Sequence, residues 1–114
     1  FLPGGVKIRT SALNALDKIA EILKETDKKV VIEGHTDNTP VGANASYETN
    51  WELASLRATS IVRYLTKYHQ IDPVRLSAIS YADTRPLEKN DSALGRSRNR
   101  RIEIYIILDE KLQN

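Results

Sequence analysis

One stretch of the chain, residues 30–38, changes from an apolar run into a cluster of side chains that can hydrogen-bond. It begins with the β-branched residues 30–32 and ends in a polar turn over residues 34–38. A polar turn at the end of a buried strand is a common way for a sheet to present a small binding site. We therefore expect the rest of the chain to position and support this turn.

His35 and Asp37 are the residues of this stretch with the most chemical options. They lie two positions apart, so on an extended chain both point to the same side as Glu33. A metal site would need a third or fourth ligand, and the other histidine, His69, lies at a helix end without ligand spacing. No nucleophile-elbow pattern places a serine against a base. We predict no metal, no cofactor and no catalytic residue, and interpret His35 as a structural hydrogen-bonding residue.

Asn50 and Arg57 form a second candidate group. They lie seven positions apart, almost two helical turns, so both fall on one helical stripe with Leu53 between them. Two interpretations of Arg57 stay open at this point. It is either a solvated surface charge or a planar guanidinium fork that receives a carboxylate.

Four arginines surround Asn99 near the end of the chain, at positions 96, 98, 100 and 101. They are either a patch for an anion or nucleic acid, or partners in local ion pairs. The acidic residues available for such pairs are Asp83, Glu88, Asp91 and Glu103. The chain has one Phe and one Trp to stack bases, and no RNA-binding aromatic motif. We therefore favour structural or ligand support over nucleic-acid binding.

The composition sets wide limits on the class of protein. The 114 residues fit one domain, with 40% hydrophobic and 28% charged residues. A net charge of +2 gives no strong attraction to nucleic acid or to an anionic membrane. The absence of cysteine excludes disulfides and thiolate chemistry, and no apolar run approaches the roughly 18 residues of a membrane span. The chain starts with Phe1 rather than Met, so we expect a fragment of a longer or processed protein.

Periodicity predicts three helices and three strands. Apolar residues recur every three to four positions after Ser11, a possible N-cap, and Thr49 with Glu52 forms a capping box. Val6 and Ile8, after a Pro-Gly-Gly turn, are either a short strand or the end of one cut off upstream. The other expected elements are a helix over about 12–25, a strand over 30–33, a loop over 39–48, a helix from near 50 to near 69, a strand over 75–81, a short helix within 90–98, a strand over 101–108 and a polar tail over 109–114.

These elements predict an α+β fold of a single domain spanning residues 1–114. Helices interleaved with strands favour a two-layer α/β sandwich, in which the helices cover one face of a mixed β-sheet. The loop over residues 39–48 is long for a compact domain, and this favours a functional loop over a simple connection.

Together the three polar groups form an ordered pattern. They are I-E-G-H-T-D-N at 32–38, N-x-x-L-x-x-x-R-A at 50–58 and N-x-x-x-x-G-R-x-x-N-R-R-I-E at 90–103. In this order they resemble the OmpA-like peptidoglycan-binding domain, over about residues 13–107. The sequences D-N-T-P-V at 37–41, N-W-E-L at 50–53 and D-T-R-P-L at 83–87, with the longer loop, are most similar to the branch of this family in flagellar motor stator proteins of the MotB and PomB type.

The resemblance implies non-catalytic binding of the peptide stem of peptidoglycan through its diaminopimelate residue. In the family, the aspartate of the first motif and the arginine of the second hold the zwitterionic end of that residue. Those positions are Asp37 and Arg57 here. The secondary candidates are Thr36 and Asn38 as hydrogen-bonding residues, Asn50 and Leu53 on the helix side, and Asn99 with Arg100 or Arg101 as support for Asp37 or for the ligand.

The resemblance also implies a place in the cell. It suggests the periplasmic, wall-facing domain of an inner-membrane-anchored protein that fixes a flagellar stator to peptidoglycan. It implies a homodimer and a MotA-type partner, reached through a membrane segment absent from this chain. The alternatives are an outer-membrane anchor of OmpA or Pal type, an interaction module with a vestigial pocket, and a small hydrolase using Glu33, His35 and Asp37.

One position departs from the family pattern. The tyrosine that usually precedes the helix asparagine is displaced, because Tyr47 lies three residues before Asn50 and Trp51 follows it. Which of these two aromatic residues contacts the ligand stays open at this point.

Overall fold

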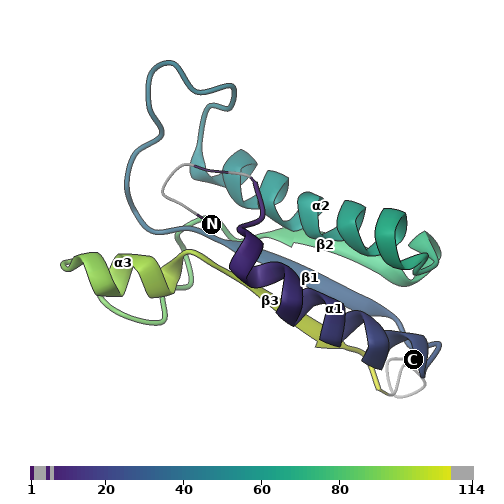
Figure 1. Ribbon diagram of the computed structural model, residues 1–114. Helices are drawn as coiled ribbons and strands as arrows, with labels where there is room; N and C mark the ends of the chain where they lie inside the picture. The colour runs from purple at the N-terminus through teal and green to yellow at the C-terminus, as the bar shows by residue number, and fades with distance from the viewer. Residues whose placement is uncertain (2–4, 6, 109–114) are drawn as a thin grey trace, which may run out of the picture.

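The computed structural model describes residues 1, 5 and 7–108, which form three α-helices, three strands and one 3-10 turn (Figure 1). In chain order these are α1 (Thr10–Lys24), β1 (Val30–His35), α2 (Asn50–His69), the 3-10 turn η1 (Pro73–Arg75), β2 (Leu76–Ser80), α3 (Ala93–Asn99) and β3 (Arg101–Ile106). Within these described residues, no helix combines the length and the apolar character needed to cross a membrane.

The three strands form a mixed sheet in the order β2-β1-β3. The central strand β1 is parallel to β2 and antiparallel to β3. Helices α1 and α2 lie over one face of this sheet, whereas α3 lies beyond its end (Figure 1). The predicted α+β class, with helices on one face of a mixed sheet, is confirmed.

The core lies between the two long helices and the sheet. Strand alternation buries Val30 and Ile32, while Val31 and Glu33 point to the opposite face and are partly exposed. Each helix contributes a stripe of buried apolar residues at helical spacing. These residues are Leu16, Ala20 and Leu23 from α1, and Ala58, Ile61 and Leu65 from α2.

Both long helices agree with the periodicity, but their N-terminal caps differ. The predicted capping box of α2 is confirmed, with Thr49 as the N-cap and Glu52 as its reciprocal partner. Ser11 is not the cap of α1, because the helix begins at Thr10 and Arg9 is the N-cap, without a side-chain cap bond. The predicted tail over 109–114 and Val6 lie outside the described residues, and residues 7–9 are not in a strand.

Strand β1 continues two residues beyond the predicted end at Glu33. Pairing with β3 explains this, because Gly34 lies opposite Ile102 and His35 opposite Arg101. Gly34 also lies directly against α2, since a Cβ atom at this position would be 2.0 Å from the carbonyl oxygen of Ala54. This close approach brings the polar turn after β1 next to the first turns of α2.

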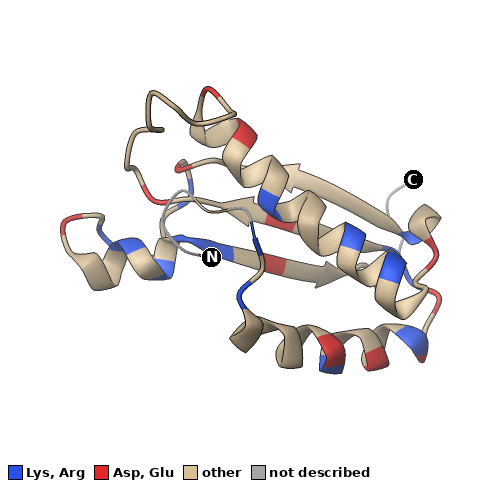
Figure 2. Ribbon diagram, turned by 45° about the horizontal axis from the view of Figure 1, so that its top comes forward, with Lys and Arg blue, Asp and Glu red and all other residues tan. Residues whose placement is uncertain are grey.

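Charged residues of both signs are distributed over the helices. Figure 2 shows Lys and Arg positions recurring along α2 and α3, with acidic positions on α1 and in the connecting segments. This distribution agrees with the small net charge of +2.

Candidate functional site

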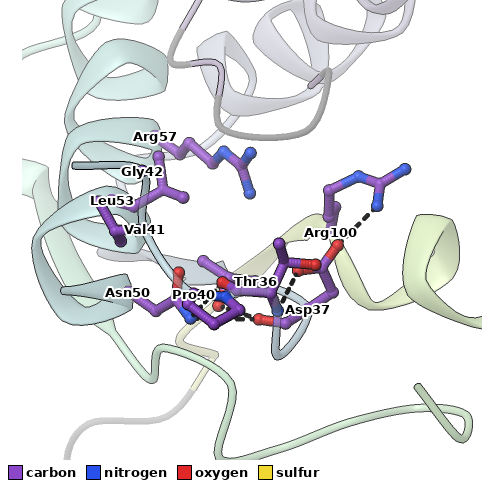
Figure 3. Close-up of a pocket in the computed structure, with 10 residues that line it drawn as sticks. Thr36, Asp37, Pro40, Val41, Gly42, Asn50, Leu53, Arg57 and Arg100 are labelled. Carbon is purple, nitrogen blue, oxygen red and sulfur yellow. Dashed lines mark hydrogen bonds and ion pairs between the residues drawn. The ribbon is translucent and has the colours of Figure 1, made fainter. Parts of the chain in front are cut away.

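A cavity of about 200 Å³ lies at the end of β1, beside the first turns of α2 (Figure 3). Three charged residues, Asp37, Arg57 and Arg100, come from three separate parts of the chain and line it together. The complete lining is Thr36, Asp37, Thr39, Pro40, Val41, Gly42, Asn50, Leu53, Arg57 and Arg100.

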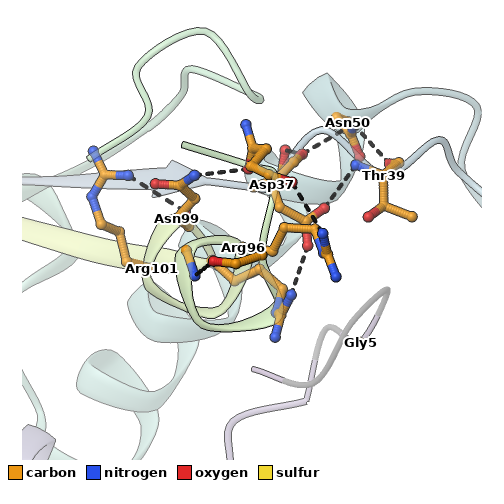
Figure 4. Close-up of polar contacts among 12 residues, drawn as sticks. Gly5, Asp37, Thr39, Asn50, Arg96, Asn99 and Arg101 are labelled. Atoms are coloured by element: carbon orange, nitrogen blue, oxygen red, sulfur yellow. Dashed lines mark hydrogen bonds and ion pairs between the residues drawn. The ribbon is translucent and has the colours of Figure 1, made fainter. Parts of the chain in front are cut away.

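Asp37 is buried, with 5% of its surface exposed, and both carboxylate oxygens accept hydrogen bonds. Oδ1 accepts from the Thr39 backbone amide at 2.8 Å (Figure 4), and Oδ2 accepts from Arg100 Nη1 at 2.6 Å (Figure 3). Burial alone would raise the pKa of Asp37, but these two hydrogen bonds outweigh it and hold the pKa below its usual value. The carboxylate is therefore ionised and fixed in orientation at neutral pH.

This depressed pKa predicts a pH-dependent contribution to stability. A carboxyl group with a lower pKa in the folded state stabilises the fold above its unfolded pKa, and this contribution disappears as the pH falls through the folded pKa. We expect Asp37→Asn to lower the free energy of unfolding by on the order of 1 kcal/mol at pH 7. Urea unfolding of both proteins from pH 7 to pH 2.5 should show this difference shrinking below about pH 4. A constant difference in unfolding free energy between pH 7 and pH 2.5 would contradict a lowered pKa of Asp37.

Arg57 is completely buried, with 0% of its surface exposed. Its Nε donates to the Gly5 carbonyl oxygen at 2.8 Å, and its guanidinium carbon lies 5.2 Å from the centre of the Phe1 ring. Burial lowers the pKa of Arg57 to about 10, so the group stays charged at neutral pH. The interpretation of Arg57 as a solvated surface charge is therefore wrong. No sequence signal connects it to Gly5, which lies 52 positions away.

Asn50 and Thr36 hold the turn that carries Asp37. The Asn50 side-chain amide donates to the carbonyl oxygens of Thr39 at 3.1 Å and of Asp37 at 3.4 Å. The Thr36 hydroxyl donates to the Asp37 carbonyl oxygen at 2.8 Å. Leu53 provides an apolar wall from α2. The structure thus places these three predicted residues at the cavity, and Asn50 and Thr36 also fix its shape.

Three predicted site residues, Asn38, Asn99 and Arg101, do not line this cavity in the described part of the chain. Asn38 is exposed on the turn. Arg101 donates through Nε to Glu103 at 2.6 Å and through Nη2 to the Arg85 carbonyl at 2.9 Å. Of the residues expected to support Asp37, the structure brings only Arg100 into contact with it.

Asn99 is fully buried and organises the segment before α3 instead. Its Oδ1 accepts from the backbone amides of Leu87 and Glu88 at 2.8 and 3.0 Å. Its Nδ2 donates to the Glu88 carbonyl and to Asn90 Oδ1, each at 2.8 Å (Figure 4). The side chain therefore satisfies four polar groups of one loop, a role set by tertiary contacts.

We expect Asn99→Ala to destabilise the domain by about 2 kcal/mol or more, because two backbone amides lose their acceptor. Ser97→Ala, an exposed change on the same helix, should alter stability by less than about 0.5 kcal/mol. Urea unfolding of the two variants tests this. Equal unfolding free energies of the two variants would show that the Asn99 side chain does not stabilise the fold.

The four arginines around Asn99 all contact groups within the domain. Arg98 is ion-paired with Glu88, Arg101 with Glu103 and Arg100 with Asp37. Arg96 donates to the Asn90 carbonyl oxygen at 3.0 Å. These contacts favour the local ion-pair interpretation of the arginine run.

His35 belongs to a separate polar network on the sheet face that α1 and α2 leave open. Its Nε2 lies 3.3 Å from Glu33 Oε1 and 3.6 Å from Glu103 Oε2, and its ring stacks on Tyr81 at 5.5 Å. One ligand-type atom from each of the three residues lies within 4.8 Å of the others. The sequence indicated Glu103 only as a partner for the arginines, because strand register alone places it opposite Glu33.

Arg101 already supplies a positive charge to this network, because its Nε donates to the same Glu103 oxygen at 2.6 Å. Burial, with a smaller contribution from Arg101, lowers the pKa of His35, so its ring is neutral at pH 7. These contacts support the interpretation of His35 as a structural residue at the end of β1.

Neither aromatic residue next to Asn50 lines the cavity. Trp51 is 49% exposed, and together with Tyr47 it lines a separate hollow at the N-terminus of α2. Neither Tyr47 nor Trp51 is therefore among the residues that line the cavity in the described part of the chain.

The chain is similar in sequence to one protein family and to several curated proteins. The model of the OmpA family matches residues 1–100. Motility protein B of Bacillus subtilis is 32% identical over 108 residues, covering 94% of this chain and 41% of that protein. The peptidoglycan-associated lipoprotein of Pseudomonas aeruginosa is 33% identical over 97 residues, covering 85% of this chain and 54% of that protein.

A solved structure, the periplasmic domain of Helicobacter pylori MotB, superimposes with a TM-score of 0.86 at 28% identity. The match covers 99% of this chain and 73% of that one. The chain spans about half the length, or less, of the two curated relatives.

Proposed function

Because the chain belongs to the OmpA family, as its three motifs predict, we propose that it binds the peptide stems of peptidoglycan. Domains of this family are non-catalytic, and the chain is not an enzyme. The observation that carries the proposal is the pairing of Asp37 and Arg57 in one cavity. The free end of diaminopimelate carries an ammonium and a carboxylate, so it needs one anion and one cation close together.

The ligand would exchange hydration for charge-assisted hydrogen bonds inside a sheltered cavity. Each such bond contributes roughly 1.5–3 kcal/mol when partly desolvated. Asp37 is ionised and held by Thr39 and Arg100, so little reorganisation is needed on its side. Arg57 is more deeply buried than Asp37 and is in contact with Phe1 and Gly5. The ligand would reach it through the cavity, or after Phe1 and Gly5 move aside.

We further propose that the domain anchors a flagellar stator of MotB type to the cell wall. The similarity to Motility protein B and to the MotB structure supports this assignment. In this proposal the domain lies in the periplasm, and the full-length protein is a homodimer with an inner-membrane anchor and a MotA-type partner. Two weak modules on one wall would gain strongly from effective concentration.

Two alternatives each have one supporting observation. The similarity to the peptidoglycan-associated lipoprotein favours an anchor between the outer membrane and the wall. The complete burial of Arg57 favours an interaction module whose wall pocket is vestigial.

Co-sedimentation with purified sacculi tests wall binding. We expect Asp37→Ala and Arg57→Ala each to abolish it, because each removes one charge of the pair. Arg98→Ala removes an exposed arginine paired with Glu88 and should bind like the wild type. Circular dichroism of all variants controls for folding, and unchanged binding by both cavity variants would refute the proposal.

Titration with soluble muropeptides separates the remaining classes. Saturable NMR shifts confined to the surroundings of Asp37 and Arg57, with intact peptides, favour the anchor. The absence of shifts favours the interaction module, and peptide cleavage would contradict the non-catalytic assignment.

A further inference from the structure

We propose that Arg100 binds a second carboxylate of the ligand, so that the cavity selects a diamino acid residue with both carboxyl groups free. The inference rests on the proposed function and adds a specificity to it. Arg100 would then act in two ways, as a fixed partner of Asp37 and as a contact for the ligand.

The charges in the cavity do not balance for a simple zwitterion. In the described lining they are one carboxylate, Asp37, and two guanidinium groups, Arg57 and Arg100. An ammonium and a carboxylate from the ligand add no net charge, so one positive charge would stay uncompensated in a poorly solvated site. A second ligand carboxylate would neutralise it, and opposite charge at short range is favourable where solvent is largely excluded.

The guanidinium group of Arg100 has N–H donors that Asp37 does not use. Its Nη1 donates to Asp37 Oδ2 at 2.6 Å, but its Nε is buried and has no hydrogen-bond partner among the residues that the structure describes. A buried donor without an acceptor is unfavourable, and a planar guanidinium can hold two carboxylates at once. A ligand carboxylate is the acceptor that this geometry lacks.

Arg100 is also the more accessible of the two guanidinium groups. Its side chain is 14% exposed, whereas Arg57 is fully buried. Arg57 reaches the cavity from α2, and Arg100 reaches it from the end of α3, on the side of Asp37 (Figure 3). Arg100 is therefore the guanidinium group that a ligand reaches more easily, and it is placed to distinguish a charged from an amidated carboxyl group.

The chemistry defines the preferred ligand. A stem peptide that ends at diaminopimelate presents one free ammonium and two carboxylates on that residue. Amidation of the carboxyl group next to the peptide bond removes the second charge, and attachment of a further amino acid moves it away. We therefore expect the unamidated, terminal residue to bind best.

Isothermal titration with two synthetic ligands tests this specificity. They are N-acetylated Ala-γ-Glu-diaminopimelate as the free acid and the same tripeptide with its C-terminal carboxyl amidated. We expect the wild type to prefer the acid roughly 10- to 100-fold, as one charge-assisted hydrogen-bonded contact provides. Arg100→Gln should lose that preference, and Arg98→Gln, on the exposed side of α3, should keep it.

The affinities that Arg100→Gln loses for the two ligands show whether Arg100 contacts the ligand or only positions Asp37. If Arg100 only held Asp37, Arg100→Gln would weaken both ligands by the same factor, and the preference would survive. If it binds the second carboxylate, the loss is larger for the acid than for the amide. Thermal unfolding of the variant shows whether it is folded.

The inference would be overturned if wild-type protein bound acid and amide equally, or if folded Arg100→Gln kept the preference. If the wild type bound neither of the two tripeptides and did not bind purified sacculi, the proposed function would be refuted, and this inference with it.

Discussion

Replacing Arg57 by methionine is expected to abolish binding to sacculi while leaving the domain at least as stable as the wild type. The pKa of Arg57 is lowered by burial to about 10, which shows that the fold disfavours the charged form. The charge thus costs stability at neutral pH, and this cost is relieved only as the pH rises through the folded pKa. Methionine has a similar length and no charge, so the replacement removes the desolvation cost of the buried guanidinium group.

Arg57→Lys provides the complementary variant. Lysine keeps the positive charge but lacks the planar fork that holds a carboxylate through two hydrogen bonds. We expect roughly tenfold weaker binding for Arg57→Lys, and a loss of about 100-fold or more for Arg57→Met. This order of affinities is expected because the carboxylate would be held by both the positive charge and the planar shape of the guanidinium group.

Fluorescence titration with a labelled muropeptide and urea unfolding on the same samples measure the two properties separately. The expected result is a loss of affinity without a loss of unfolding free energy in Arg57→Met. Wild-type affinity in a folded Arg57→Met protein would exclude Arg57 as a ligand contact. A strongly destabilised Arg57→Met protein would show that this arginine is retained for the fold.

Local patterns in the sequence were sufficient to predict most elements and half of the cavity. The capping box at Thr49 and the stripe of Asn50, Leu53 and Arg57 depend on neighbours within one helix, so periodicity finds them. The polar turn after β1 was equally visible, because a glycine and hydrogen-bonding residues directly follow an apolar run. Such features need no knowledge of which distant segments meet.

The rest of the site depends on contacts between distant segments. Arg100 contacts Asp37 across 63 positions, and Arg57 contacts Gly5 across 52. Neighbouring arginines in one short run therefore take different roles, and no local signal distinguishes Arg100 at the cavity from Arg101 at Glu103. The family resemblance could indicate that this run matters, but only the packing of α3 and β3 assigns its members.

Very low tolerance to substitution is expected at Gly34. Adding one methyl group in Gly34→Ala should destabilise the domain by about 3 kcal/mol or more, at the upper end of overpacking effects. The added Cβ would lie 2.0 Å from the Ala54 carbonyl oxygen and 2.8 Å from its carbonyl carbon. These are backbone atoms of α2, so no side-chain rotation can relieve the overlap.

Relief of this overlap must move α2 away from β1, and that movement separates the two halves of the cavity. Asp37 follows β1, whereas Asn50, Leu53 and Arg57 lie on α2, so we expect Gly34→Ala to lose wall binding even where it folds. Gly42→Ala is the matched control for stability, because a Cβ there has no heavy atom within 4 Å. Gly42 itself lines the cavity, so Arg98→Ala is the control for binding. Urea unfolding of the two glycine variants, and co-sedimentation of Gly34→Ala beside Arg98→Ala, test this expectation. A Gly34→Ala protein within about 0.5 kcal/mol of the wild type would show that the contact between β1 and α2 does not set the geometry of the cavity.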